Sequence, residues 1–270
     1  MKADGRECPN HALPELAQRE VFSVSPDAPY KADLALTYAC NNRCGHCYNE
    51  QGRRSMRTLP ERDWLKILKR LKAIGVPHLI FTGGEPTLFP ELPRLIHHAD
   101  RMGFITGLNT NGRQLARSEY AWGLAAAGLN HIQVTIQSSS AATHDCMSGA
   151  CAFDETVAGI GHALASGIHV ITNTTLTRRN CGDIVQFIDF LYGLGIRTFA
   201  MNGMIYAGLG RNCEEALSYE EMQPVLEDVR DAAAEREMRF LWYTPTDYCH
   251  LSPLELGLGM RRCNAAEYSI

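Results

Sequence analysis

The sequence predicts an α/β fold, a partial TIM-like (β/α)6 barrel, from three observations. Short apolar runs alternate with longer stretches that repeat apolar residues at helical spacing, which is typical of a parallel sheet. Polar and glycine-rich segments follow the apolar runs, at the strand ends where ligands gather in such folds. The length of 270 residues suits one barrel domain. A doubly wound open sheet is the alternative.

The expected strands and helices alternate along the chain. We expect strands over 34–38, 78–82, 105–109, 131–136, 170–176, 198–202 and 240–243. We expect helices over 61–74, 92–102, 120–127, 156–166, 184–194 and 219–237. The domain organisation that follows is an extended N-terminal segment at 1–30, a core barrel at 31–240 and a C-terminal tail at 241–270.

Composition narrows the class of function. The net charge of −4 gives no sign of the basic face that nucleic-acid binding needs. No apolar run is long enough to span a bilayer, and the polar start of the chain does not resemble a secretory signal. We therefore expect a cytoplasmic protein with neither nucleic acid nor membrane as partner. In that compartment ten cysteines indicate metal or redox chemistry rather than disulfides.

Three of these cysteines, Cys40, Cys44 and Cys47, follow the first expected strand closely. Three thiolates are one short of the four that normally saturate a [4Fe–4S] cluster. Such a cluster leaves one iron open, and an open iron can bind the amino and carboxylate groups of a substrate. Two other interpretations stay open: a zinc site completed by a histidine, for which the adjacent His46 is awkwardly placed, and inert buried thiols.

Two motifs resemble those of the radical S-adenosylmethionine (SAM) superfamily. Residues 40–47, C-N-N-R-C-G-H-C, resemble its CxxxCxΦC signature, with His46 at the usually aromatic position. Residues 81–88, F-T-G-G-E-P-T-L, resemble the GGEP motif that contacts the SAM amino group. Softer matches are N-T-N-G at 109–112 and T-I-Q-S at 135–138. Together the matches cover most of residues 33–202.

The resemblance implies a fold of the radical SAM type, a cofactor site and a reaction. Cys40, Cys44 and Cys47 would bind a [4Fe–4S] cluster whose open iron binds SAM. One electron from a small redox protein of the flavodoxin or ferredoxin type would cleave SAM to a 5′-deoxyadenosyl radical that abstracts hydrogen from a substrate. Gly83, Gly84 and Glu85 would hold the methionine end of SAM, Ser138 and Asn173 the ribose or carboxylate, and His46 would lie near the adenine; the full set implied to contact SAM is His46, Gly83, Gly84, Glu85, Asn111, Ser138 and Asn173.

Residues 133–180 resemble the SPASM/twitch-type branch, which includes the pyrroloquinoline-quinone precursor-peptide cross-linking enzyme and relatives in haem d1 synthesis and sulfatase maturation. A peptide is therefore the first expected substrate and a cofactor precursor the second. The tail around Cys263 resembles the truncated start of the branch's extension, so an auxiliary iron–sulfur cluster would require the chain to continue. We expect this tail to be poorly anchored, with Cys249 and Cys263 free or badly ligated. The alternative function is an electron-transfer iron–sulfur protein or a zinc-stabilised binding module.

Overall fold

A computed structural model describes residues 28–50, 52, 55–259 and 269–270. Its seven strands form one sheet in the order β1-β2-β3-β4-β5-β6-β7, and all neighbouring strands are parallel. The consecutive order confirms the partial barrel. The doubly wound alternative is wrong, because its strand order reverses at a switch point. The expected N-terminal segment, up to residue 27, and Cys263 lie outside the described residues.

The expected strands and helices are all present, with ends displaced by a few residues. The strands are β1 (Lys31–Thr37), β2 (His78–Gly83), β3 (Ile105–Thr110), β4 (His131–Thr135), β5 (His169–Thr175), β6 (Thr198–Asn202) and β7 (Arg239–Trp242). The helices are α2 (Glu61–Ala73), α3 (Leu92–Arg101), α4 (Ser118–Ala126), α5 (Ala141–Ser148), α6 (Phe153–Ala165), α7 (Ile184–Gly193) and α8 (Tyr219–Glu235). Short 3₁₀ helices are η2 (Pro86–Leu88), η3 (Arg113–Ala116) and η4 (Gly208–Asn212).

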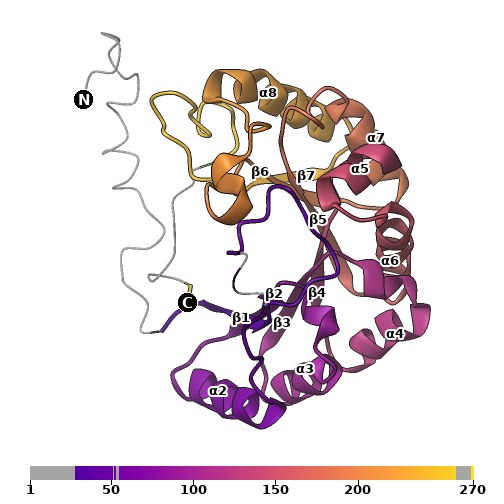
Figure 1. Ribbon diagram of the computed structural model, residues 1–270, viewed down its shortest axis with the longest axis vertical. Helices are drawn as coiled ribbons and strands as arrows, with labels where there is room; N and C mark the ends of the chain where they lie inside the picture. Colours follow the sequence, from indigo (N-terminus) through magenta and orange to yellow (C-terminus); the bar gives the residue numbers. More distant parts are fainter. Residues whose placement is uncertain (1–27, 51, 53–54, 260–268) are drawn as a thin grey trace.

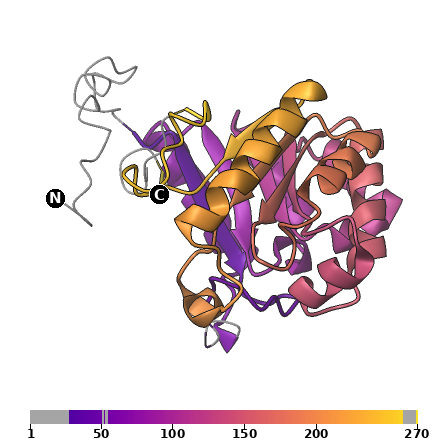
Figure 2. The same ribbon diagram turned by 90° about the horizontal axis from the view of Figure 1, so that it is seen from above.

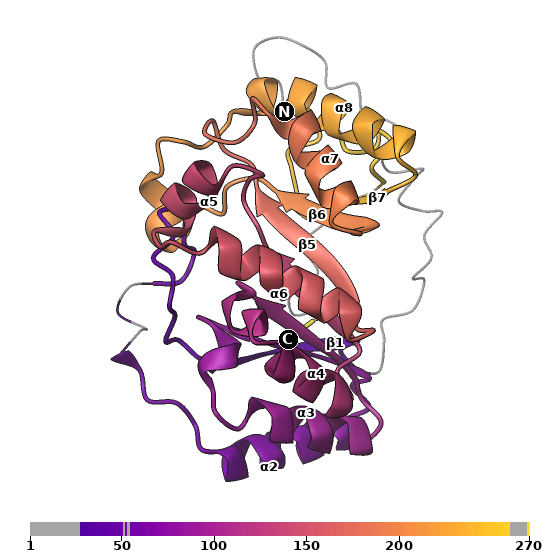
Figure 3. The ribbon, with the colours of Figure 1, turned by 90° about the vertical axis from the view of Figure 1, so that its right-hand side faces the viewer.

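The helices lie in an arc along the outside of the curved sheet (Figure 1). Figure 2 and Figure 3 show the same outer layer of helices from two other sides. Because β1 and β7 end the strand order, the barrel is open between them. Among the described residues, no helix has the combined length and apolar character that crossing a membrane would require.

Alternation along the strands separates a core face from a cavity face. The core side chains that face the helices include Leu34, Leu79, Phe81, Leu108, Ile132 and Val134, all buried. Successive strand residues point to opposite faces of a sheet. Polar residues such as Thr82, Asn109 and Asn173 therefore project to the concave side near the carboxyl ends of their strands.

Helix α5, directly after β4, is an element that the sequence did not predict. Ser140 caps its start by accepting a hydrogen bond from the backbone N–H of Thr143, and Gly149 ends it in the left-handed region at φ 62°. Its sequence, A-A-T-H-D-C-M-S, has a single large apolar residue, Met147, so it lacks the apolar stripe that identifies a helix.

The last two residues of the chain pair with the edge of β1. The backbone N–H of Ile270 donates to the carbonyl of Lys31 at 3.1 Å, and the N–H of Asp33 donates to the carbonyl of Ile270 at 2.7 Å. Cys249 is in a disulfide. The expectation of a poorly anchored tail is therefore wrong for Ser269 and Ile270, and the expectation of a free thiol is wrong for Cys249.

Candidate functional site

A cavity lies at the carboxyl ends of the strands, on the concave side of the sheet. Its volume is about 180 Å³, and it is partly open to solvent. Strands β2 to β6 contribute Thr82, Asn109, Thr135, Asn173 and Asn202 to its wall. The segment 40–47, called the cysteine loop from here on, lines another side. The position is the one where parallel α/β folds bind ligands.

All three cysteines of the predicted cluster site line this cavity. Cys40, Cys44 and Cys47 are partly buried, and none of them is in a disulfide. No three Cys, His, Asp or Glu side chains among the described residues converge on the position of one metal ion. Three thiolates on one loop are the donor set of a [4Fe–4S] cluster with one open iron.

The cysteine loop is anchored from two sides. The backbone N–H of Arg43 donates to the carbonyl of Ser148, at the end of α5, at 2.9 Å. The N–H of Leu209, in η4, donates to the carbonyl of Cys47 at 2.8 Å. A β-carbon on Gly149 would lie only 2.3 Å from the Arg43 carbonyl oxygen, so this close approach of α5 to the loop requires glycine.

The paired glycines at the end of β2 bring that strand against the chain just before Cys40. Gly83 has φ +139°, and a β-carbon there would lie 2.1 Å from the carbonyl oxygen of Thr37. A β-carbon on Gly84 would lie 2.4 Å from the carbonyl oxygen of Ala39. The N–H of Gly84 donates to the Thr37 carbonyl at 2.7 Å. The two glycines thus set the distance between β2 and the cysteine loop, in addition to lining the cavity.

Glu85 lines the cavity, but other residues of the protein already form hydrogen bonds to its carboxylate. The side chain is 1% exposed. Its Oε1 accepts hydrogen bonds from the N–H and hydroxyl of Thr87 and from the hydroxyl of Thr110, and its Oε2 accepts one from the N–H of Asn111 at 2.7 Å. Burial raises the pKa of Glu85, and these hydrogen bonds oppose that rise. The carboxylate expected to meet the SAM ammonium thus joins the ends of β2 and β3.

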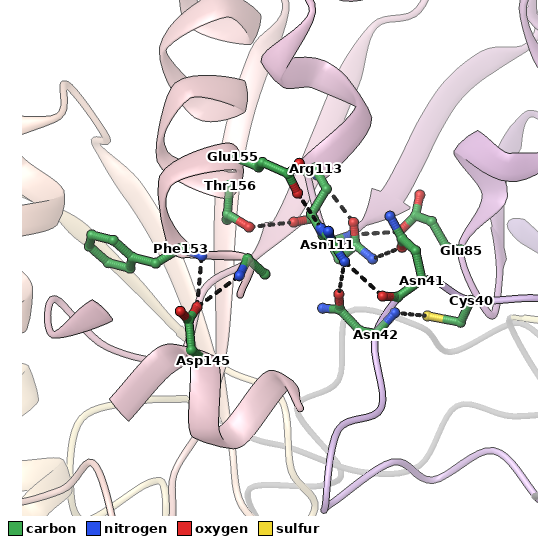
Figure 4. A network of polar contacts seen from close by, with 12 residues as sticks. Cys40, Asn41, Asn42, Glu85, Asn111, Arg113, Asp145, Phe153, Glu155 and Thr156 are labelled. Carbon is green, nitrogen blue, oxygen red and sulfur yellow. Dashed lines mark hydrogen bonds and ion pairs between the residues drawn. The ribbon is translucent and has the colours of Figure 1, made fainter. Parts of the chain in front are cut away.

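Asn111 extends this connection to the cysteine loop (Figure 4). Its Nδ2 donates to Oδ1 of Asn41 at 2.7 Å, and its Oδ1 accepts from the N–H of Arg113 at 3.1 Å. Asn111 lines the cavity, as the resemblance implies for a SAM contact. Because protein partners already use both ends of its amide, the structure supports a bridging role for this side chain.

At the end of β4, the structure brings Gln137 rather than Ser138 to the cavity. Ser138 is not among the residues that line it, and its hydroxyl accepts from the N–H of Ser140. Gln137, buried at 1% exposed, follows Thr135 by two residues and so shares its side of the extended chain. That alternation is the signal that could have identified Gln137 from the sequence.

Gln137 contacts the ring of His46, which also lines the cavity, and favours one of its tautomers. The Oε1 of Gln137 accepts from the N–H of Thr175 at 3.0 Å, so its Nε2 is the group that faces Nε2 of His46 at 3.2 Å. An amide NH₂ can only donate, so the imidazole nitrogen accepts. Burial lowers the pKa of His46. The hydrogen bond from Gln137 therefore favours the tautomer of His46 with its proton on Nδ1.

The side-chain oxygen of Asn173 is available to accept a hydrogen bond from a ligand. The Nδ2 of Asn202 donates to the carbonyl of Gly203 at 2.9 Å, so the Oδ1 of Asn202 faces Asn173 and accepts from its Nδ2 at 3.0 Å. The Oδ1 of Asn173 remains buried without a hydrogen-bond partner. A buried polar atom of this kind is costly unless a ligand pairs with it. Asn202 was not singled out from the sequence, although it ends an expected strand.

Comparison with known proteins places the chain in a family. The model of the radical SAM superfamily matches residues 34–191. A PqqA peptide cyclase from Streptomyces rochei is 30% identical over 228 residues, which cover 82% of this chain and 62% of that protein. A probable GTP 3′,8-cyclase from Saccharolobus islandicus is 27% identical over 214 residues, which cover 78% of this chain and 68% of that protein.

Among solved structures, Streptococcus suis SuiB bound to precursor peptide SuiA has a TM-score of 0.73 at 20% identity, over 85% of this chain and 52% of that one. This likeness shows the fold. The chain spans less than two thirds of the length of the cyclase from Streptomyces and about half of SuiB. The family match takes in more than half of the chain, including the cysteine loop and Gly83–Gly84. The chain belongs to the radical SAM superfamily of enzymes.

Proposed function

We propose that this chain cleaves SAM reductively at a [4Fe–4S] cluster and that the resulting 5′-deoxyadenosyl radical abstracts hydrogen from a peptide. The observation that carries the proposal is the cysteine loop set beside Gly83 and Gly84 on one cavity. The cluster, when bound, supplies the electron that breaks the sulfonium C–S bond. Membership of an enzyme superfamily decides against the electron carrier and the zinc-stabilised binding module.

Cys40, Cys44 and Cys47 would hold the cluster with three thiolates, and its remaining iron would be available to the amino and carboxylate groups of SAM. The glycines provide backbone carbonyls for the ammonium group. The carbonyl of Gly83 accepts from Nδ2 of Asn49 at 3.1 Å and keeps a second lone pair for a ligand.

Two side chains, those of Asn173 and His46, are proposed to contact the nucleoside part of SAM. The unpaired Oδ1 of Asn173 can accept from a ribose hydroxyl, but it cannot pair with a carboxylate, which also only accepts. Asn173 is therefore assigned to the ribose and not to the carboxylate. His46, held by Gln137, would lie near the adenine and would offer its Nδ1 hydrogen to that part of the cavity.

A peptide is the proposed substrate because of the proteins that this chain resembles. A cofactor precursor such as a tetrapyrrole is the alternative. Two of the similar proteins are named for peptide modification or were solved with a precursor peptide.

The electron donor is proposed to be a small redox protein of the flavodoxin or ferredoxin type, because the reaction consumes one electron at a time. The proposed compartment is the cytoplasm, where thiols that must bind iron stay reduced. An auxiliary iron–sulfur cluster would need cysteines beyond those that line this cavity.

The test is SAM cleavage by protein reconstituted anaerobically with iron and sulfide. With dithionite and SAM, we expect 5′-deoxyadenosine, measured by chromatography and mass spectrometry. Cys44→Ala should abolish the product and the SAM-dependent change in the EPR spectrum, because two thiolates cannot replace three. Cys146→Ala is the matched control, since Cys146 is an exposed thiol on α5. Four irons per chain with SAM left intact under every reductant would refute the proposal.

The substrate class is tested by deuterium transfer. Deuterated precursor peptides and deuterated GTP are supplied separately with unlabelled SAM. We expect deuterium in 5′-deoxyadenosine from a peptide alone. Transfer from GTP would contradict the proposed peptide substrate.

A further inference from the structure

Arg113 is a charged residue, largely buried, to which the reaction proposed above gives no role. It begins η3, directly after β3, and its side chain is 18% exposed. Its Nη1 donates to the backbone carbonyl of Asn41 at 2.7 Å and to Oδ1 of Asn42 at 3.1 Å. Its Nε forms an ion pair with Glu155 on α6. Figure 4 shows the guanidinium between α6 and the cysteine loop.

Arg113 bonds Asn41 and Asn42, which lie between Cys40 and Cys44 and adjoin the Cys40 thiol. The backbone N–H of Asn42 donates to Sγ of Cys40 at 3.4 Å. Hydrogen bonds to cysteine sulfurs are one of the means by which proteins adjust the reduction potential of iron–sulfur clusters. The contact of Arg113 with Asn42 therefore acts on the residue that makes this bond.

We propose that Arg113 is a positioning residue, which presets the cysteine loop and the N–H···S bond to Cys40 for cluster binding. This inference rests on the proposed function. The guanidinium is planar and carries several donors in fixed directions, so it can hold the Asn41 carbonyl, the Asn42 amide and Glu155 at once. A lysine, with one compact ammonium group, can hold only part of this set.

Glu155 compensates the positive charge that Arg113 brings near the cysteine loop. Its carboxylate orients the guanidinium and compensates its positive charge, although Glu155 itself is half-exposed. Arg113 thus holds the loop without leaving an uncompensated cation beside the cluster site. Removing the charge of Glu155 should therefore stabilise the reduced cluster, which is the more negative state.

The first measurement is hydrogen–deuterium exchange of the full chain, before and after cluster reconstitution. In Arg113→Met, we expect amides of residues 40–47 to exchange about tenfold faster before reconstitution, since two hydrogen bonds from a charged donor are lost. Arg113→Lys should restore part of the protection. Arg117→Met is the matched control, because Nη2 of Arg117 bonds Gln114 in its own turn. Equal acceleration across the whole barrel, or none in the loop, would overturn the proposal.

The second measurement is on the reconstituted cluster without SAM. We expect Arg113→Met to retain less iron and to change the EPR spectrum of the reduced cluster, and Glu155→Gln to raise its reduction potential. Wild-type spectra and potentials in both variants would overturn the proposal. Its failure is separable from that of the proposed function: a wild-type protein that binds the cluster and leaves SAM intact refutes the reaction, whereas exchange in the loop is measured without SAM.

Discussion

Replacing Glu85 by glutamine changes one atom of a buried hydrogen-bonding group. Oε1 of Glu85 accepts three hydrogen bonds, and Oε2 accepts one from the N–H of Asn111 at 2.7 Å. If the amide oxygen keeps the three donors, the new NH₂ faces the Asn111 N–H, and two donors oppose each other. A buried donor left without a partner costs about 1–3 kcal/mol. We expect Glu85→Gln to lower the free energy of unfolding by that amount.

Glu85→Ala should have a larger effect, because it removes the acceptor of all four donors. Each buried donor that is left without a partner costs about 1–3 kcal/mol, so the loss should exceed that of Glu85→Gln. The assay is urea denaturation under anaerobic, reducing conditions, with SAM affinity measured on the reconstituted variants. Glu119→Gln, at an exposed position of α4, is the control and should stay within about 0.5 kcal/mol of wild type. Weakened SAM binding with unchanged stability would refute the bridging role and favour a direct contact.

The pH dependence of Glu85 has a defined sign. Burial raises its pKa, so the folded chain keeps this proton at higher pH than the unfolded chain does. The stabilisation that comes from binding this proton is complete below the pKa that Glu85 has in the unfolded chain. It is lost as the pH rises through the pKa that Glu85 has in the folded chain. Glu85→Gln does not titrate and should lack it. An unchanged pH profile in the variant would contradict the assignment.

Three further predictions concern other polar groups. Asn173→Ala should weaken SAM binding by about 0.5–1.5 kcal/mol, or roughly two- to tenfold, in an equilibrium titration; unchanged affinity would exclude the ribose contact. Gln137→Leu should shift the side-chain ¹⁵N resonances of His46 away from the pure Nδ1–H form, and wild-type resonances would show that another group sets the tautomer. Burial, followed by the charges of neighbouring histidines, lowers the pKa of His131 to about 4. Stability should therefore fall with pH from about 6.5 to 4, less steeply in His131→Gln; the same slope as in the exposed control His97→Gln would contradict this.

The barrel could be predicted from the sequence because its signals are local. Each strand of a parallel sheet covered on its outer face is a short apolar run, and each crossover helix repeats apolar residues at helical spacing. Helix α5 escaped prediction because Ala141–Ser148 lacks an apolar stripe and is defined by a cap and a left-handed glycine. The position of this helix matters to the site, since its end holds Arg43 of the cysteine loop.

The sequence also led to Ser138 where the structure brings Gln137 to the cavity, and to a ligand contact at Glu85 where the carboxylate meets four protein donors. A motif match identifies a segment, but it does not state which side chain in the segment turns inward. That orientation depends on where each strand ends and on which donors lie nearby, and both are properties of the packed molecule.

By itself, the sequence determined the order of strands and helices and the presence of three thiols on one short loop, because both follow from neighbours along the chain. Only the tertiary structure decided what holds that loop. The bond between Arg113 and Asn41 joins residues 72 positions apart, and the bond between Asn111 and Asn41 joins residues 70 apart. Hydrogen bonds are short and directional, so such pairs form only after parallel strands bring their carboxyl ends together.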